Sequence, residues 1–114
     1  MPAPTTDVAV QYGHRTLRLP GFDLEGYLAY DARRGALTLT DHRGDVEVLS
    51  VDLRADGYVA APGEVLVKDW SEHAGLAGAL IDAGVAMRTE TLVVGPFASR
   101  AYRLLMLDPE GMGR

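Results

Sequence analysis

The 114-residue chain contains no cysteine, which excludes disulfide bonds, thiolate metal sites and cysteine nucleophiles and fits a reducing compartment. It also lacks an excess of positive charge, because 11 Lys and Arg stand against 16 Asp and Glu, for a formal net charge of −5. Nucleic acid is therefore an unexpected partner, since duplex binding depends on neutralising phosphates. Neither a membrane-length apolar run nor a basic-then-apolar secretory signal is found, so we expect a cytoplasmic protein with no membrane partner.

The remaining composition is that of a folded domain, with 47% hydrophobic and 24% charged residues. A chain of this length buries about two-thirds of its surface on folding, which suits one core. No internal repeat and no shift in composition marks a boundary. We therefore predict a single domain over residues 1–114, with residues 1–6 and 108–114 flexible.

Alternating apolar residues and turn residues predict strands throughout the first 68 residues. In the first hairpin, strands at 8–12 and 15–19 flank a turn at Gly13-His14. A second hairpin has strands at 27–30 and 36–40 around the turn 31–35, and a third turn follows at 41–44. In the run 46–53, the apolar positions are even-numbered up to Val48 and odd-numbered from Leu49 onward. This change in which alternate residues face inward indicates a bulge or a bend. Short strands at 58–60 and 64–68 complete this part.

One helix is predicted, over residues 71–83, and two strands follow it at 89–94 and 101–107. Asp69 or Ser71 is the expected N-cap, Gly84 ends the helix, and an apolar stripe that includes Leu76 and Leu80 packs on the sheet. Turns about ten residues apart favour antiparallel strands. The predicted fold class is α+β, a mainly antiparallel meander or partly closed barrel covered by this helix.

The residues that could carry chemistry form no recognised catalytic motif. His14, His42 and His73 fall in two turns and at a helix start, without the spacing of metal ligands, and we expect them to be solvated. There is neither a nucleophile elbow nor a phosphate-binding glycine loop. We predict no metal and no cofactor.

The densest polar cluster is Lys68–His73, where a strand meets the helix. Asp69, Ser71 and Glu72 suit helix capping, and the two carboxylates among them disfavour an anion at this helix start. Trp70 suits core packing, or it presents a ring face to a partner.

The segment Val65–Glu72 (VLVKDWSE), followed by Gly75 and by residues 79–85 (ALIDAGV), resembles a small bacterial family of unknown function. That family carries a V-x-V-K-D-[YW]-S-E core, and the resemblance extends over about residues 64–107. His73-Ala74 departs from the pattern, and the first sixty residues do not match it. The resemblance implies a small cytoplasmic bacterial protein, often encoded on plasmids or other mobile elements, with no assigned activity.

Two functional hypotheses follow. The first is a non-enzymatic interaction or accessory module that binds a protein partner or its own copy, because unpaired strand edges need cover. The alternative is a small enzyme or ligand-binding domain with a pocket at the strand–helix junction, beside Trp70. There, Asp69, Glu72 and His73 would act as acid or base, and Arg100 or Arg103 would hold an anionic group.

Overall fold

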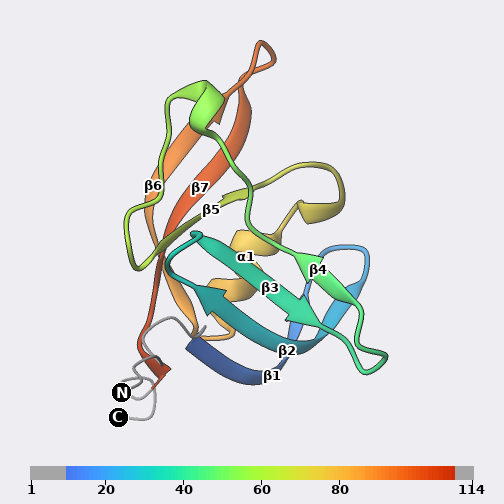
Figure 1. Cartoon of the computed structure of the whole chain (residues 1–114). Coiled ribbons are helices and arrows are strands. Elements are labelled where there is room, and N and C mark those ends of the chain that lie inside the picture. Colours follow the sequence, from blue (N-terminus) through green and yellow to red (C-terminus); the bar gives the residue numbers. More distant parts are fainter. Residues whose placement is uncertain (1–9, 110–114) are drawn as a thin grey trace, which may run out of the picture.

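The computed structural model describes residues 10–109 and arranges them as two antiparallel sheets and one α-helix (Figure 1). The first sheet, in the order β1-β2-β3-β4, contains β1 (Val10–Arg18), β2 (Asp23–Asp31), β3 (Ala36–Thr40) and β4 (Val46–Val48). The second, in the order β5-β7-β6, contains β5 (Glu64–Lys68), β6 (Ala86–Val94) and β7 (Ser99–Met106). Helix α1 (Leu76–Asp82) follows β5 in the chain. The α+β prediction is confirmed, and across the described residues the two sheets do not close into a barrel.

The first hairpin differs from its prediction. Strand β1 runs through Gly13 without turning, and its register to β2 shifts between Gln11 and Gly13. Gly13, with φ of 78°, serves a β-bulge, which requires the same left-handed backbone as a tight turn. The chain reverses later, at Pro20-Gly21, where the N–H of Leu19 donates to the carbonyl of Phe22 at 2.9 Å.

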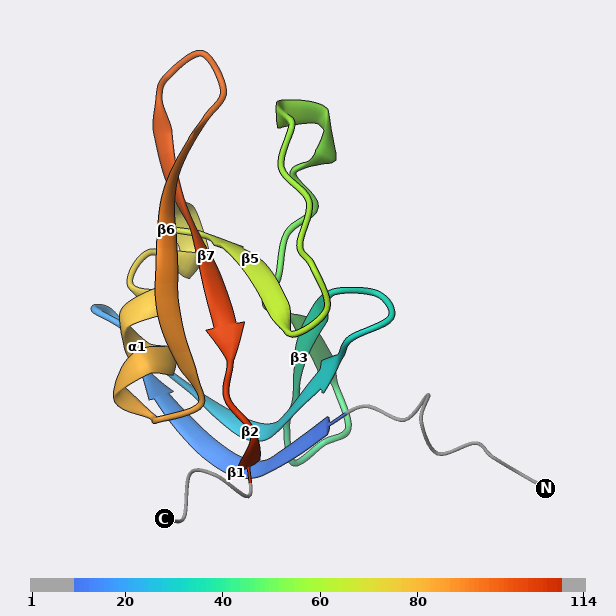
Figure 2. The ribbon, with the colours of Figure 1, turned by 90° about the vertical axis from the view of Figure 1, so that its left-hand side faces the viewer.

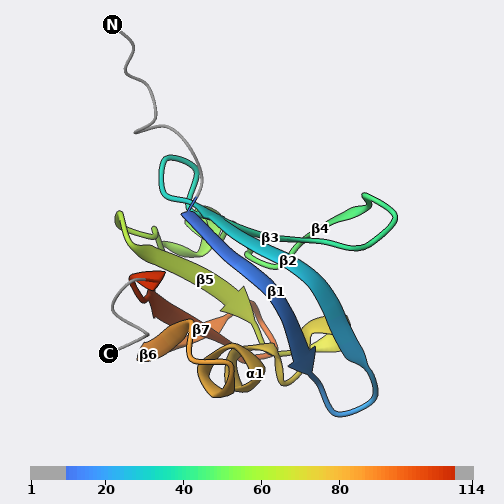
Figure 3. The ribbon, with the colours of Figure 1, turned by 90° about the horizontal axis from the view of Figure 1, so that it is seen from below.

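The next two turns follow the prediction. The turn 31–35 joins β2 to β3, and the turn 41–44 joins β3 to β4, with the N–H of Gly44 donating to the carbonyl of Asp41. Strand β2 extends beyond β3, whose last residue pairs with Tyr27, and the two strands diverge (Figure 3). At this point Gly26 lies under the backbone of Thr40, so close that a Cβ atom would lie 2.3 Å from the Thr40 oxygen.

Residues 49–60 form no strand, so the predicted strands at 49–53 and 58–60 are wrong. The N–H of Leu49 still bonds Leu37 in the first sheet, whereas the N–H of Val51 bonds Leu66 in the second. The chain therefore crosses from one sheet to the other just after Val48, where the inward-facing positions were predicted to change. A short 3₁₀ turn, η2 (Arg54–Asp56), follows the crossing.

The helix is shorter than predicted. Residues Ser71–His73 form a separate 3₁₀ turn, η3, and α1 begins only after Gly75, whose φ is 86°. Neither Asp69 nor Ser71 is the N-cap residue, because the left-handed Gly75 interrupts the helical backbone between them and α1. Gly84, with φ of 80°, ends the helix as predicted.

Two apolar clusters hold these elements together. The larger lies between the first sheet, α1 and one face of the second sheet, and it contains Leu28, Leu80 and Leu104, none of them exposed. The smaller lies on the other face of the second sheet, where segment 49–63 (green in Figure 2) covers Leu66 and Leu92. The second sheet is thus covered on both faces.

Candidate functional site

The strand–helix junction is a structural connection in which Asp69 has the central place. One carboxylate oxygen of Asp69 accepts the N–H of Gly75 at 2.8 Å, and the other lies 3.4 Å from the hydroxyl of Tyr102. The N–H of Asp69 donates to the carbonyl of Arg100, whose side chain is exposed. Asp69 thus joins the start of α1 to β7.

Trp70 and Glu72 have separate surroundings. Trp70 is half-buried against the smaller apolar cluster, and the ammonium group of Lys68 lies 5.7 Å from its ring centroid. Glu72 is exposed and pairs with Lys68 at 3.2 Å. Hydrogen bonds from the Ser71 hydroxyl, from its own backbone and from Lys68 lower the pKa of Glu72 to about 2.

His73 is buried, contrary to the expectation that it is solvated. The residue is 6% exposed, and its Nε2 lies 3.3 Å from the carboxylate of Glu47 in β4. Nδ1 is buried without a hydrogen-bond partner among the described residues. No local pattern predicts this burial, because Glu47 reaches the histidine through the pairing of β4 with β3.

Arg103 lies on the opposite face of β7 from Tyr102 and the Asp69 segment. Its guanidinium bonds Glu90 at 2.8 Å, Glu64 at 2.9 Å and the carbonyl of Val59 at 2.7 Å. The hydrogen bond to Glu90 is the main cause of the raised pKa of Arg103. Arg103 therefore attaches segment 49–63 to the second sheet and does not converge with Asp69.

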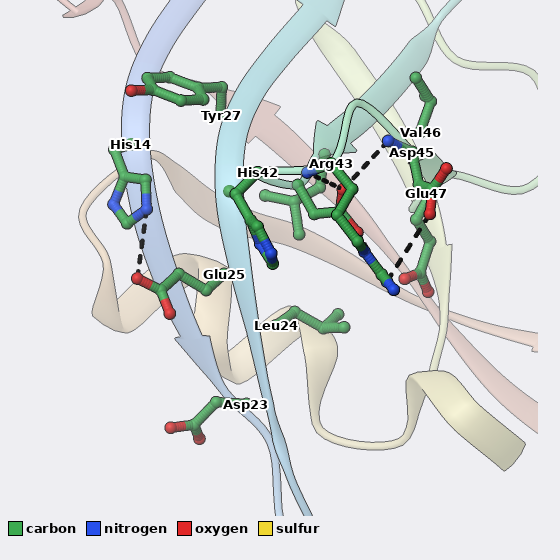
Figure 4. Close-up of a pocket in the computed structure, with 13 residues that line it drawn as sticks. His14, Asp23, Leu24, Glu25, Tyr27, His42, Arg43, Asp45, Val46 and Glu47 are labelled. Atoms are coloured by element: carbon green, nitrogen blue, oxygen red, sulfur yellow. Dashed lines mark hydrogen bonds and ion pairs between the residues drawn. The ribbon is translucent and has the colours of Figure 1, made fainter.

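A groove of about 840 Å³, called groove 1, opens between the free end of β2 and the β3–β4 turn (Figure 4). Within it, His14 lies 3.2 Å from the carboxylate of Glu25 and packs edge-on against Tyr27. Five carboxylates and one guanidinium line this groove, namely Asp23, Glu25, Asp41, Asp45, Glu47 and Arg43. Desolvation raises the pKa of Asp41, but hydrogen bonds from the backbone of Asp45 and Arg43 outweigh it and lower the pKa overall.

A second groove of about 590 Å³, called groove 2, lies at the other end of β3 and β4, between the turn 31–35 and segment 49–63. Its lining has the opposite charge, with three guanidiniums and one carboxylate, from Arg33, Arg34, Arg54 and Asp52. The side chains of Val48, Val51 and Leu53 add apolar surface. The two grooves thus give the ends of β4 opposite charge.

Strand β4 lies between these grooves and is the edge of the first sheet. The N–H of Asp41 donates to the carbonyl of Asp45, and the N–H of Leu49 donates to the carbonyl of Leu37. In an antiparallel ladder every second cross-strand pair is hydrogen-bonded, so the Leu39–Glu47 pair between these two is hydrogen-bonded as well. Val46 and Val48 therefore direct their N–H and C=O groups away from β3. Within residues 10–109 no strand pairs with this side, and the two valines are 61% and 55% exposed. We call Val46–Val48, with this outward backbone, the β4 edge.

Sequence reasoning did not identify groove 1 or the β4 edge. His14, Glu25 and Glu47 come from three strands, and only the register brings them to one end of the sheet. The apolar run 46–53 predicts inward positions for Val46 and Val48, whereas both side chains are exposed. A signal was nevertheless present in the parity change after Val48, which marks the end of β4.

Several other classes of site are not found. Among residues 10–109, no group of three or more His, Asp or Glu side chains is arranged to hold a metal ion. No helix in this range is long and apolar enough to cross a membrane. No protein-family model, curated protein or solved structure matches the chain. The resemblance of residues 64–107 to a bacterial family therefore stays a prediction.

Proposed function

We propose that this chain is a non-enzymatic interaction module of the cytoplasm, and that its β4 edge pairs with an extended segment of another polypeptide. The observation that carries the proposal is the outward backbone of Val46 and Val48 at an exposed sheet edge. An added strand would bond these groups and cover both valine side chains. Such recognition needs no catalytic residue.

The surroundings of the β4 edge support selective pairing. Groove 1 gives one end negative charge and groove 2 gives the other positive charge. A strand with charges of the opposite order would be favoured in one direction and one register, because like charges brought together oppose the alternatives. The edge is also short, which limits unspecific aggregation.

The alternative, an enzyme or ligand-binding domain beside Trp70, has less support. Asp69 bonds the backbone of Gly75, Glu72 pairs with Lys68, and His73 pairs with Glu47. These three side chains therefore have different partners and do not converge on a shared space. Trp70 and His73 line neither groove 1 nor groove 2.

A peptide titration tests the proposed function. The probe is a blocked heptapeptide in which valine alternates with charged residues, Glu-Val-Glu-Val-Lys-Val-Lys, so that an antiparallel strand places its glutamates at groove 2 and its lysines at groove 1. The matched control peptide has proline in place of the central valine. In ¹⁵N NMR spectra of dilute protein, the first peptide should shift the amide signals of Val46 and Val48, and the control peptide should not. Shifts confined to other residues, or none at millimolar peptide, would contradict the proposal.

A further inference from the structure

We infer that the partner strand is β4 of a second copy of this chain, paired antiparallel about a two-fold axis at Glu47. The inference rests on the proposed function and names the partner. An interface of this kind is isologous, so each copy contributes the same surface and the assembly closes as a dimer. Both β4 edges are then covered.

The backbone of β4 is self-complementary in this register. Val46 and Val48 are the residues whose N–H and C=O groups point outward. With Glu47 on the axis, Val46 faces the partner's Val48, and the pair exchanges both backbone hydrogen bonds as in any antiparallel ladder. Val48 and the partner's Val46 form the symmetric pair and exchange the same two bonds. Each outward N–H and C=O group of the two valines therefore gains a hydrogen bond.

The exposed side chains also match. Val46 and Val48 lie on the same face of the sheet, because residues two apart in a strand share a face. Across the axis they would meet the partner's two valines directly, and β-branched cross-strand pairs stabilise such contacts. Side chains that are 61% and 55% exposed in one chain would form a small apolar cluster in the dimer.

The charges favour the antiparallel direction. Groove 1 lies at the start of β4 and groove 2 at its end, with net charges of opposite sign from their lining residues. Two-fold pairing brings the acidic end of one copy towards the basic end of the other. A parallel arrangement would place like charges together, at a cost that rises as salt is removed.

One contact opposes the pairing. The two Glu47 residues would face each other across the axis on the inner face of the sheet, and like charges at that position are unfavourable. Each carboxylate is held 3.3 Å from the ring of its own His73, which lies deeper in the same chain. Replacing Glu47 by Gln should therefore tighten the dimer by roughly two- to fivefold.

Sedimentation equilibrium over a range of concentrations tests the inference. We expect a monomer–dimer equilibrium in the micromolar range, since the strand is short, and weaker dimerisation at high salt. Val48→Glu should raise the dimer dissociation constant at least tenfold. Val93→Glu is the matched control, because Val93 is 56% exposed but lies on β6, and this variant should dimerise normally.

A second variant separates loss of pairing from loss of folding. Val48→Pro removes an N–H that points away from β3, so the ladder to β3 keeps its bonds while the dimer loses its own. Circular dichroism would verify the fold. A strictly monomeric wild-type chain, or a dimer that survives both Val48 variants, would overturn the inference. A monomer that still binds the valine-rich heptapeptide would leave the proposed function standing, and a monomer that does not bind it would remove both.

Discussion

Nε2 of the buried His73 lies 3.3 Å from the carboxylate of Glu47, and this contact joins the segment before α1 to the edge strand β4. The pair connects residues 26 positions apart. It also places one of the carboxylates that line groove 1 against His73, the one buried residue of the polar or charged class among residues 10–109. Disturbing it should affect both the stability of the chain and the position of β4.

Glu47→Leu should destabilise the chain by about 1–3 kcal/mol, because both ring nitrogens of His73 would then be buried without a partner. Glu47→Gln keeps an oxygen and an N–H near the ring and should cost less. Urea unfolding at low protein concentration measures both. The control is Glu25→Leu, which removes the exposed pair with His14 and should change stability by less than about 0.5 kcal/mol. Equal effects of the two leucine variants would contradict the assigned role of His73.

Gly26→Val should destabilise the fold by about 3 kcal/mol or more, since its Cβ would lie 2.3 Å from the backbone oxygen of Thr40. The strands β2 and β3 would have to separate at this crossing. Gly78→Ala is the contrasting change, because Gly78 lies within α1 and, apart from its chain neighbours and the backbone of its own helix, no atom lies within 4 Å of the added Cβ. We expect that variant to be more stable by about 0.5–1 kcal/mol, as measured by thermal unfolding.

Tyr12 should make the chain sensitive to high pH. Its hydroxyl donates to the carbonyl of Leu107, and burial, followed by the nearby Tyr30 and Asp108, raises the pKa of Tyr12 to about 12. An acid whose pKa is raised on folding stabilises the fold below its unfolded value, near 10, and this contribution is lost as the pH rises towards 12. Tyr12→Phe should lose about 1 kcal/mol at neutral pH, and its stability should fall less between pH 10 and 12. Parallel stability curves for the two proteins over that range would contradict the prediction.

Glu64 should contribute to stability at neutral pH and lose that contribution in acid. The backbone N–H of Ala61 lowers the pKa of Glu64 most, and Arg103 lowers it further against the opposing effect of desolvation. A depressed carboxyl pKa gives stability that is present above the unfolded value, near 4.5, and lost as the pH falls through the folded value. Glu64→Gln should therefore lower the free energy of unfolding at pH 7 by about 1 kcal/mol relative to the wild type, and this difference should shrink below pH 4. Chemical unfolding at both pH values provides the measurement.

The sequence by itself determined the parts of the fold that depend on local conformation. The turns at 31–35 and 41–44 formed as predicted, because Gly35 and Gly44 supply the positive φ these turns require. Alternation likewise predicted β3, whose side chains are buried on one face only. A β-strand buries alternate residues whichever strand becomes its neighbour.

Tertiary structure decided the features on which the functional site depends. Gly13 could serve a turn or a bulge, and only pairing with β2 selected the bulge. Val48 and Leu49 belong to one apolar run, but the chain leaves the first sheet just after them, so Val48 is exposed at an edge while Leu49 is buried. His73 is buried because β4 brings Glu47 against it. These outcomes depend on contacts between distant residues, and no local pattern contains that information.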